Sequence, residues 1–298
     1  MNTPAPEKPT GPASDPAPLI AAAVTVLLWA SAFVGIRYAA PFLSPGPLAL
    51  GRLAVGTVAL GALVLVRREA LPRGGDWWRI VVIGVLWFGV YNVALNAGER
   101  VVDAGTAAMV INVAPLLIAL LAGWLLREGF PRSLLAGLGV AFAGSVVVGL
   151  ATSQGGGSAP VVGVLLCLAA AVVYAISVVL QKGVLARVSA VQVTFLGCAV
   201  GMVCTLGWAP QLVHEIGNAP ATVPLTVIYL GLFPTAIAFT TWAFALKHLP
   251  AGRLGATTYV VPALVVVMSW ILLGEVPPWG ALVGGAMCLV GVAISRRR

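Results

Sequence analysis

Polar and aromatic side chains lie at the centre of otherwise apolar stretches of this chain, where burial without a partner is costly. In 88-FGVYNVALN-96, Phe88, Asn92 and Asn96 recur every four residues and share one helix face, which Tyr91 adjoins. These side chains combine amide donors and acceptors with aromatic rings. The combination suits non-covalent binding of a small molecule that carries both charged and apolar groups.

The same mixture recurs in five other apolar segments. Each residue could instead fill a helix interface or form a hydrogen bond across helices, which are the ordinary roles of such side chains. Their recurrence in so many segments favours a shared cavity that suits apolar or aromatic amino acids. These further candidates are Trp29 and Ser31; Asn112; Tyr174, Ser177 and Gln181; Thr235, Phe239 and Trp242; and Thr258 and Tyr259.

The composition indicates the kind of fold that must position these residues. Of 298 residues, 60% are hydrophobic and 9% are charged, whereas a soluble domain is about a quarter charged. Apolar runs of about twenty residues recur, and each can cross the membrane as a helix. We therefore predict an all-α integral membrane protein. Residues 1–17 are rich in Pro and Ala, which predicts a disordered tail.

Hydropathy and charge breaks predict ten spans. Placing the N-terminus in the cytoplasm puts 14 of the 17 Lys and Arg at the inner face and leaves Arg37, Arg52 and Arg100 elsewhere. Both termini are then cytoplasmic, and the net charge of +8 needs no nucleic acid as partner. The predicted spans are 18–39, 46–66, 78–97, 104–126, 132–150, 161–182, 190–209, 223–245, 252–273 and 278–295.

An internal repeat relates the two halves of the chain. The segments that begin at Ala104 and Ala251 match at a constant offset of 147 residues, which pairs Glu128 with Glu275. Each half holds five spans, and an odd number inverts the second half. We predict a first repeat at 18–150, a Gly/Ser-rich linker at 151–160 and a second, inverted repeat at 161–298. Inverted repeats are typical of secondary transporters.

The repeat also aligns residues that disturb a helix. Pro115 aligns with Pro262, and Gly84 with Gly231, each pair 147 residues apart. A proline inside a helix costs about 3 kcal/mol, so its recurrence predicts a kink with a function. We expect these four residues to act in gating, although close packing is the alternative interpretation for the glycines.

The charged residues restrict the substrate class. Arg52 lies some way inside its span, where it could snorkel, pair with an acid at the outer face or attract a substrate carboxylate. The acids argue against a proton-coupled exporter of cationic drugs, because they fall at helix ends: Glu99, Asp103, Glu128 and Glu275.

No pattern of catalytic or metal-binding residues occurs. The histidines are His214 and His248, and neither has metal-ligand spacing to a cysteine. We expect no enzyme activity, metal or cofactor, and a monomer in the lipid bilayer. The cysteines fall in apolar segments and are interpreted as small buried hydrophobes: Cys167, Cys198, Cys204 and Cys288.

Three sequence features resemble the drug/metabolite transporter superfamily in its EamA-type branch: LLWASAFVGIRY in the first span, PxxLALGRLAVG at the second, and the paired AG…P…E…P blocks. The resemblance implies ten helices in two inverted repeats, and alternating access in which helices three, four, eight and nine bend around a cavity. It also implies a bacterial inner membrane and export of small metabolites, most like the exporters of aromatic and other amino acids. Export of other neutral metabolites or drugs is the alternative, and a non-transport membrane subunit is a further one.

Overall fold

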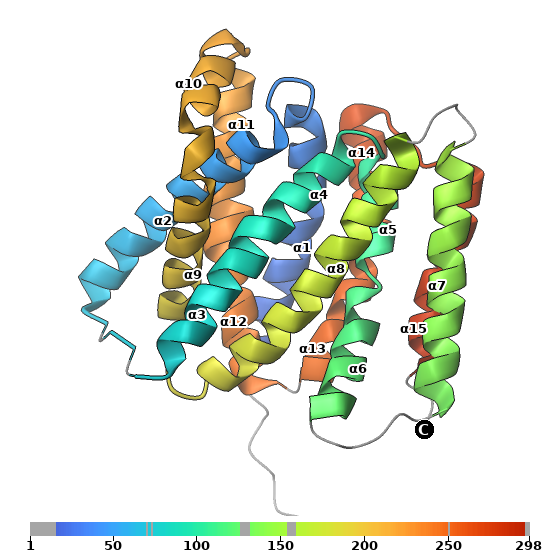
Figure 1. The fold of residues 1–298 in the computed structure, drawn as a ribbon, viewed down its shortest axis with the longest axis horizontal. Helices are drawn as coiled ribbons and strands as arrows, with labels where there is room; N and C mark the ends of the chain where they lie inside the picture. The colour runs from blue at the N-terminus through green and yellow to red at the C-terminus, as the bar shows by residue number, and fades with distance from the viewer. Residues whose placement is uncertain are drawn as a thin grey trace, which may run out of the picture.

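The computed structural model describes residues 16–69, 71–72, 74–125, 132–153, 159–249 and 251–295. Within these residues every regular element is a helix, and the helices form one bundle (Figure 1). The predicted all-α membrane fold is confirmed. Most of the predicted tail, and residues 154–158 of the predicted linker, lie outside the described residues.

The first half contains five spans, two of which consist of more than one helix. The third span changes helix type twice and the fourth is broken once. Their bounds are α1 (Ala17–Ala39), α2 (Pro45–Arg67), then α3 (Asp76–Ile83) with η1 (Gly84–Val90) and α4 (Tyr91–Glu99), then α5 (Ala104–Ile111) with α6 (Ala114–Leu125), and α7 (Arg132–Ser153).

The second half repeats this order. Its second span is longer than predicted, because η2 (Leu206–Trp208) and α10 (Ala209–Asn218) continue it. The bounds of the others are α8 (Ala159–Val184), α9 (Ala190–Thr205), then α11 (Thr222–Leu230) with η3 (Gly231–Ile237) and α12 (Ala238–His248), then α13 (Ala251–Thr257) with η4 (Thr258–Val260) and α14 (Val261–Leu273), and α15 (Trp279–Ser295).

Six helical stretches of the described chain are long and apolar enough to cross a membrane, and four shorter apolar helices accompany them. Because the number of spans is even, α1 begins and α15 ends at the same end of the bundle (Figure 1). We call this end the Lys182 face, after a residue near the end of α8. The opposite end, where α1 finishes, is called the Arg37 face.

Two π-helices, η1 and η3, occupy equivalent positions in the third and eighth spans, and each begins at a glycine of the predicted pair. A π-turn leaves main-chain carbonyls without their usual donors. Side chains fill this need: Asn92 Nδ2 donates to the carbonyl of Phe88 at 2.8 Å, and the Thr235 hydroxyl donates to that of Leu230 at 2.8 Å. Pro234, inside η3, has no N–H to offer.

The paired prolines follow helix breaks. α5 ends at Ile111 and α6 begins at Ala114, so Pro115 lies in the first turn of a new helix. Pro262 likewise follows the 3₁₀ turn η4, in the first turn of α14. At such positions the missing N–H has no intrahelical partner to lose. The sequence predicted kinks at the prolines, whereas the structure has a break just before each one.

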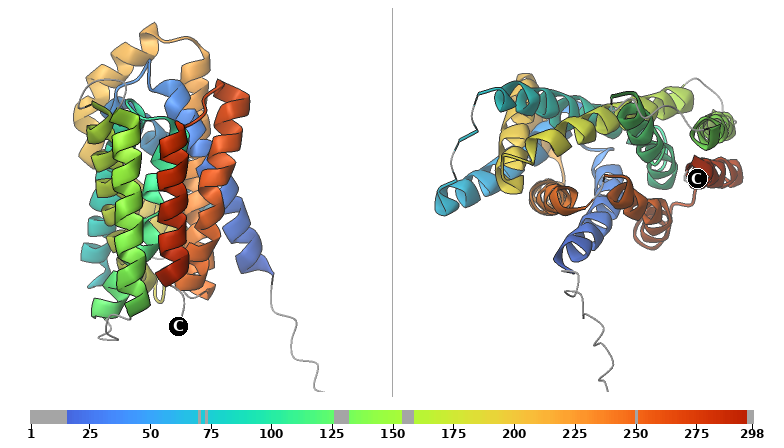
Figure 2. Two further views of the ribbon diagram at one scale, coloured as in Figure 1. Left: turned by 90° about the vertical axis from the view of Figure 1, so that its right-hand side faces the viewer. Right: turned by 90° about the horizontal axis from the view of Figure 1, so that it is seen from below.

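The fifth and tenth spans, α7 and α15, lie side by side at one edge of the bundle (Figure 2). A Cβ atom on Gly144 would lie 2.6 Å from the carbonyl oxygen of Gly284, and one on Gly291 would lie 2.5 Å from that of Gly137. Only glycine permits so close an approach of the two backbones. The repeated glycines of these spans therefore form the contact between the repeats at this edge.

Gly84 and Gly231 also pack closely against the other repeat. A Cβ atom on Gly84 would lie 2.9 Å from the carbonyl oxygen of Gly197 in α9, and one on Gly231 would lie 2.7 Å from that of Arg52 in α2. Both glycines thus have a packing role, and hinging at them stays a prediction.

Three of the cysteines are buried, namely Cys167, Cys198 and Cys288. Cys204 is exposed, so the prediction that all four are buried was wrong for this residue. Cys204 lines an apolar surface groove together with Val93 and Trp208. The apolar character of a segment predicts that its residues can lie in lipid or in the protein interior. It does not predict which side of the helix faces the interior.

Candidate functional site

A small cavity lies at the centre of the bundle, between the two repeats. It is lined by residues of α1, α2, η1, α4, α5 and α6 from the first repeat and of α8, α12, η4 and α14 from the second. Its volume is about 50 Å³, whereas ligand pockets usually enclose about 300–1,000 Å³. The cavity is therefore contracted, an arrangement called here the closed conformation, and it must widen to hold a molecule the size of an amino acid.

Aromatic rings gather around Trp29 at this cavity. The centroid of the Trp29 ring lies 4.9 Å from that of Trp242, 5.4 Å from that of Phe239 and 5.9 Å from that of Tyr174. Trp87 of η1 completes the group, with its centroid 5.1 Å from that of Tyr174. These separations are those of attractive aromatic pairs. The rings come from both repeats, so they form the centre of the contact between the halves.

Arg52 is the one charged residue among the described residues that line the cavity. Its exposed fraction is 3%. The guanidinium donates from Nε to the Thr235 hydroxyl at 3.1 Å, which can accept because its own hydrogen goes to Leu230. A buried cation is costly without a counter-charge. Arg52 thus gives the cavity a site suited to an anionic group.

Two further polar atoms at the cavity are without a hydrogen-bond partner among the described residues, Asn112 Oδ1 and the Tyr174 hydroxyl. Asn112 uses its Nδ2 to donate to the main-chain carbonyl of Thr258 at 2.8 Å. Its Oδ1 can therefore accept from a ligand ammonium, and the Tyr174 hydroxyl can donate or accept. A cation, an acceptor and a hydroxyl surrounded by rings match the groups of a zwitterionic amino acid.

Several residues predicted from the sequence meet at the cavity. They are Trp29, Tyr91, Asn112, Tyr174, Phe239 and Thr258, together with Pro115. Trp242 contacts the ring of Trp29 from the second repeat. The structure thus brings the first, third, fourth, sixth, eighth and ninth spans together, as the shared-cavity hypothesis requires.

The stripe of the third span that borders the cavity is Trp87, Tyr91 and Leu95. The predicted stripe began one residue later, at Phe88, Asn92 and Asn96. A spacing of four fits both stripes, so the spacing alone could not choose between them. Phe88 instead packs against Gly197 and Gly201 of α9, and Asn96 Nδ2 donates to the Pro45 carbonyl of α2 at 3.1 Å.

Four other predicted residues do not line the cavity. Ser31 forms a 2.6 Å hydrogen bond with the Tyr229 hydroxyl in a separate groove. Ser177 donates to the carbonyl of its own helix at Val173, and Gln181 is fully buried nearer the Lys182 face. Tyr259 packs against the apolar cluster of Val113 and Leu116, so of the two candidates in the ninth span only Thr258 borders the cavity.

Sequence reasoning left Trp87 out of the candidates and kept three roles open for Arg52. The sequence could have indicated Trp87, because it lies four residues before the candidate Tyr91 and so on the same helix face. Arg52 is an arginine well inside an apolar span, which the sequence shows, but its neighbours depend on how α2 packs against η3. The structure places Arg52 in the lining of the cavity and holds its guanidinium by the hydrogen bond to Thr235.

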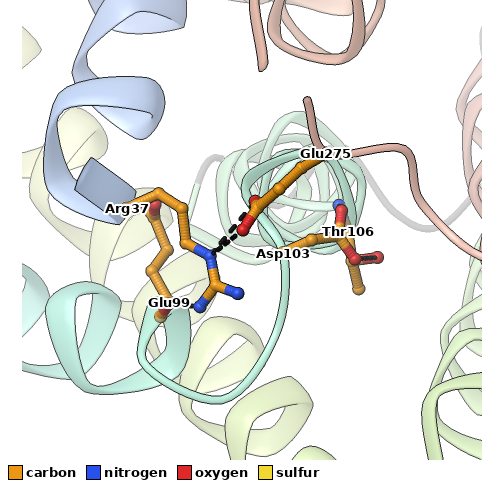
Figure 3. Close-up of polar contacts among 5 residues, drawn as sticks. All are labelled: Arg37, Glu99, Asp103, Thr106 and Glu275. Carbon is orange, nitrogen blue, oxygen red and sulfur yellow. Dashed lines mark hydrogen bonds and ion pairs between the residues drawn. The ribbon is translucent and has the colours of Figure 1, made fainter. Parts of the chain in front are cut away.

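At the Arg37 face a polar cluster joins the repeats (Figure 3). Arg37 Nε donates to the Glu275 carboxylate at 2.8 Å and 3.1 Å, and a second guanidinium nitrogen, Nη1, donates to the main-chain carbonyl of Glu99 at 2.7 Å. Beside them, Asp103 accepts from the backbone and the hydroxyl of Thr106 and so caps α5. The ion pair links α1 of the first repeat to the end of α14 in the second.

The Lys182 face shows the equivalent contact within the second repeat. Lys182 Nζ donates to the carbonyl of Leu246, and to that of Leu249 at 2.9 Å. Leu246 follows Glu99 by 147 residues. Lys182 follows Arg37 by 145 residues, the offset that aligns the first spans of the two repeats after a gap of two residues. Each repeat thus ties its first span to the end of its third span, at opposite faces of the membrane protein.

Comparisons with known proteins agree with this architecture. The model of the EamA-like transporter family matches residues 17–150 and residues 161–297. A protein of Streptantibioticus cattleyicolor named "Probable terminal-alkyne amino-acid exporter" is 37% identical over 92% of this chain and 92% of its own. The aromatic amino acid exporter YddG of Ancylobacter novellus is 29% identical over 72% of this chain and 75% of its own.

Two further comparisons complete the picture. An uncharacterized transporter of Bacillus subtilis, YdfC, is 31% identical over 93% of this chain and 90% of its own. A solved crystal structure that is 23% identical shares the fold, with a TM-score of 0.66 over 95% of this chain and 97% of the other. The chain belongs to the EamA-like transporter family and is a membrane transporter of ten spans in two inverted repeats, not an enzyme.

Proposed function

We propose that this protein exports amino acids, aromatic and other neutral ones among them, across the inner membrane of a bacterium. Two relatives whose names include amino-acid export support the substrate class. The positive-inside rule supports an orientation with both termini in the cytoplasm. The Lys182 face is then cytoplasmic and the Arg37 face is outside.

The observation that carries this proposal is the buried guanidinium of Arg52 in a cavity walled by aromatic rings. In the widened cavity the substrate carboxylate binds Arg52, and Asn112 Oδ1 accepts from its ammonium. The substrate side chain lies among the rings around Trp29. Each of these contacts uses an atom that the fold itself leaves without a full set of partners.

Transport proceeds by alternating access around this site. The fourth and ninth spans are broken at the cavity, and the third and eighth contain π-turns. These irregular segments are the places where a span can change direction with few hydrogen bonds to lose. The inverted repeat makes the two directions of bending equivalent, so that one opens the cavity to the cytoplasm and the other to the outside.

The test is counterflow of labelled phenylalanine, leucine and alanine in proteoliposomes, with phenethylamine as the analogue that lacks the carboxylate. Arg52→Gln removes a charge-assisted hydrogen bond worth about 1.5–3 kcal/mol, so its apparent affinity for phenylalanine falls at least about tenfold. Arg67→Gln, an exposed position at the end of the same helix, is the matched control and keeps wild-type affinity.

Two results would overturn the proposal. If no amino acid in the panel gives flux, amino acids are excluded as substrates, and other neutral metabolites should be screened. The second result is that the wild type transports phenylalanine and phenethylamine equally well and that Arg52→Gln does the same. Arg52 would then not bind the substrate carboxylate.

A further inference from the structure

Glu99, the last residue of α4, is an acidic side chain that the protein itself covers completely. Its exposed fraction is 0%, although it lies at the end of a span. Oε1 and Oε2 have no hydrogen-bond partner among the described residues. The contact with Arg37 uses the main-chain carbonyl of Glu99 instead (Figure 3). The fold therefore buries this carboxyl group without a hydrogen bond to either oxygen from the described residues.

The same face of α4 offers acceptors where an ionised carboxylate needs donors. Asn92 donates to the carbonyls of Trp87 and Phe88 and Asn96 donates to that of Pro45. Their Oδ1 atoms have no partner within the described chain. A buried carboxylate without a donor is costly to keep ionised. The neutral acid, which carries its own proton, fits this closed conformation better.

The charged groups around Glu99 differ in whether they already have a counter-charge. Arg37 is paired with Glu275, and Asp103 is held in the cap of α5. Both Arg37 and Arg52 interact electrostatically with Glu99. Of the two, Arg52 has no salt bridge in the described chain. The other titratable side chains that interact with Glu99 are Tyr91 of α4 and Cys167 of α8.

We propose that Glu99 is a proton-binding site whose charge sets how strongly Arg52 holds the substrate carboxylate. When Glu99 is ionised, Arg52 already has an anion nearby and attracts a second one less. When Glu99 carries a proton, the full charge of Arg52 acts on the substrate. Proton and substrate therefore strengthen each other's binding by the same factor. This inference rests on the proposed function, because it requires a substrate with a carboxylate.

The experiment measures leucine affinity by tryptophan fluorescence of the purified full-length protein at pH 8.5 and pH 5.5. Leucine is chosen because it does not fluoresce, whereas Trp29 and Trp87 border the cavity. The wild type binds leucine at least about fivefold more tightly at the lower pH, the lower end of typical coupling between sites. In weakly buffered solution at the higher pH, a pH indicator detects proton uptake when leucine is added.

Three variants separate Glu99 from other titrating groups. Glu99→Gln is permanently neutral, so its affinity is high and the same at both pH values. Glu99→Asp keeps a titratable carboxyl and keeps the pH dependence. Glu69→Gln, at the Lys182 face beside Ser189, is the matched control and behaves as the wild type.

The outcomes distinguish this inference from the proposed function. Wild-type binding that is independent of pH, without proton uptake, overturns the role of Glu99 and leaves amino-acid export intact. A pH dependence retained in Glu99→Gln overturns it as well. If Glu99→Gln does not fold, the inference is tested by whether the wild type takes up protons when leucine is added. Absence of leucine binding to the wild type at both pH values overturns the proposed function, and the role of Glu99 with it.

Discussion

Asn112 donates a hydrogen bond from Nδ2 to the main-chain carbonyl of Thr258 at 2.8 Å, and this bond joins the helix break of the fourth span to that of the ninth. Thr258 lies in the 3₁₀ turn η4, and Asn112 is the C-cap residue that follows α5. The two breaks belong to different repeats. Because the hydrogen bond connects them, a change in one break disturbs the other. The bond lies at the cavity, so it is placed to couple opening to the two sides.

Asn112→Ala is expected to lower the transport rate and the stability of the closed conformation. The substitution leaves the Thr258 carbonyl without its donor in a buried position, which costs about 1–3 kcal/mol. Counterflow rates and the melting temperature of the purified protein measure the two effects. Asn218→Ala is the matched control, because that side chain donates to a main-chain carbonyl at an exposed site. Rates equal to those of the wild type would show that the breaks move independently.

Trp29→Ala is expected to weaken binding of phenylalanine more than binding of alanine. The ring of Trp29 contacts Trp242, Phe239 and Tyr174, and each such aromatic contact is worth about 0.5–1.5 kcal/mol. Competition by unlabelled amino acids in the flux assay gives the ratio of the two affinities. Trp279→Ala, at an 81% exposed position, serves as the control. An unchanged ratio would mean that the substrate side chain binds away from these rings.

The Arg37–Glu275 ion pair is expected to stabilise the Arg37 face by a modest amount. Both side chains are about a quarter exposed, at 26% and 29%, so the coupling energy from a double-mutant cycle is about 1 kcal/mol or less. Arg37→Gln, Glu275→Gln and the double variant complete the cycle by thermal unfolding. The coupling should shrink in high salt, because salt screens partly exposed charges. Strictly additive effects of the two substitutions would exclude the pair as a link between the repeats.

Gly144→Leu is expected to prevent stable packing of α7 against α15. Even a Cβ atom at this position would lie 2.6 Å from the carbonyl oxygen of Gly284, and such overpacking costs about 1–3 kcal/mol or more. The yield of monodisperse protein from membranes measures the loss. Gly139→Leu, in the same helix with open space around its Cβ position, should be tolerated. Equal yields of the two variants would contradict the close backbone contact.

The sequence by itself determined the membrane fold and its symmetry. Apolar run length sets the number of spans because a helix must cross a fixed thickness of hydrocarbon. The offset of 147 residues aligned Gly84 with Gly231 and Pro115 with Pro262, and the structure places an irregular segment at each. Residue types and periodicity carry this information locally, without reference to packing.

The tertiary structure decided which side chains meet. A spacing of four residues could not choose between the stripes of Phe88 and of Trp87, because both fit one helix face and only the packing of η1 against its neighbours selects one. The burial of Arg52 and Glu99 was equally undetermined, since the environment of a charge depends on helices far away in the chain. The sequence therefore predicts how far along a span a residue lies, whereas long-range packing determines which side of the helix faces the cavity.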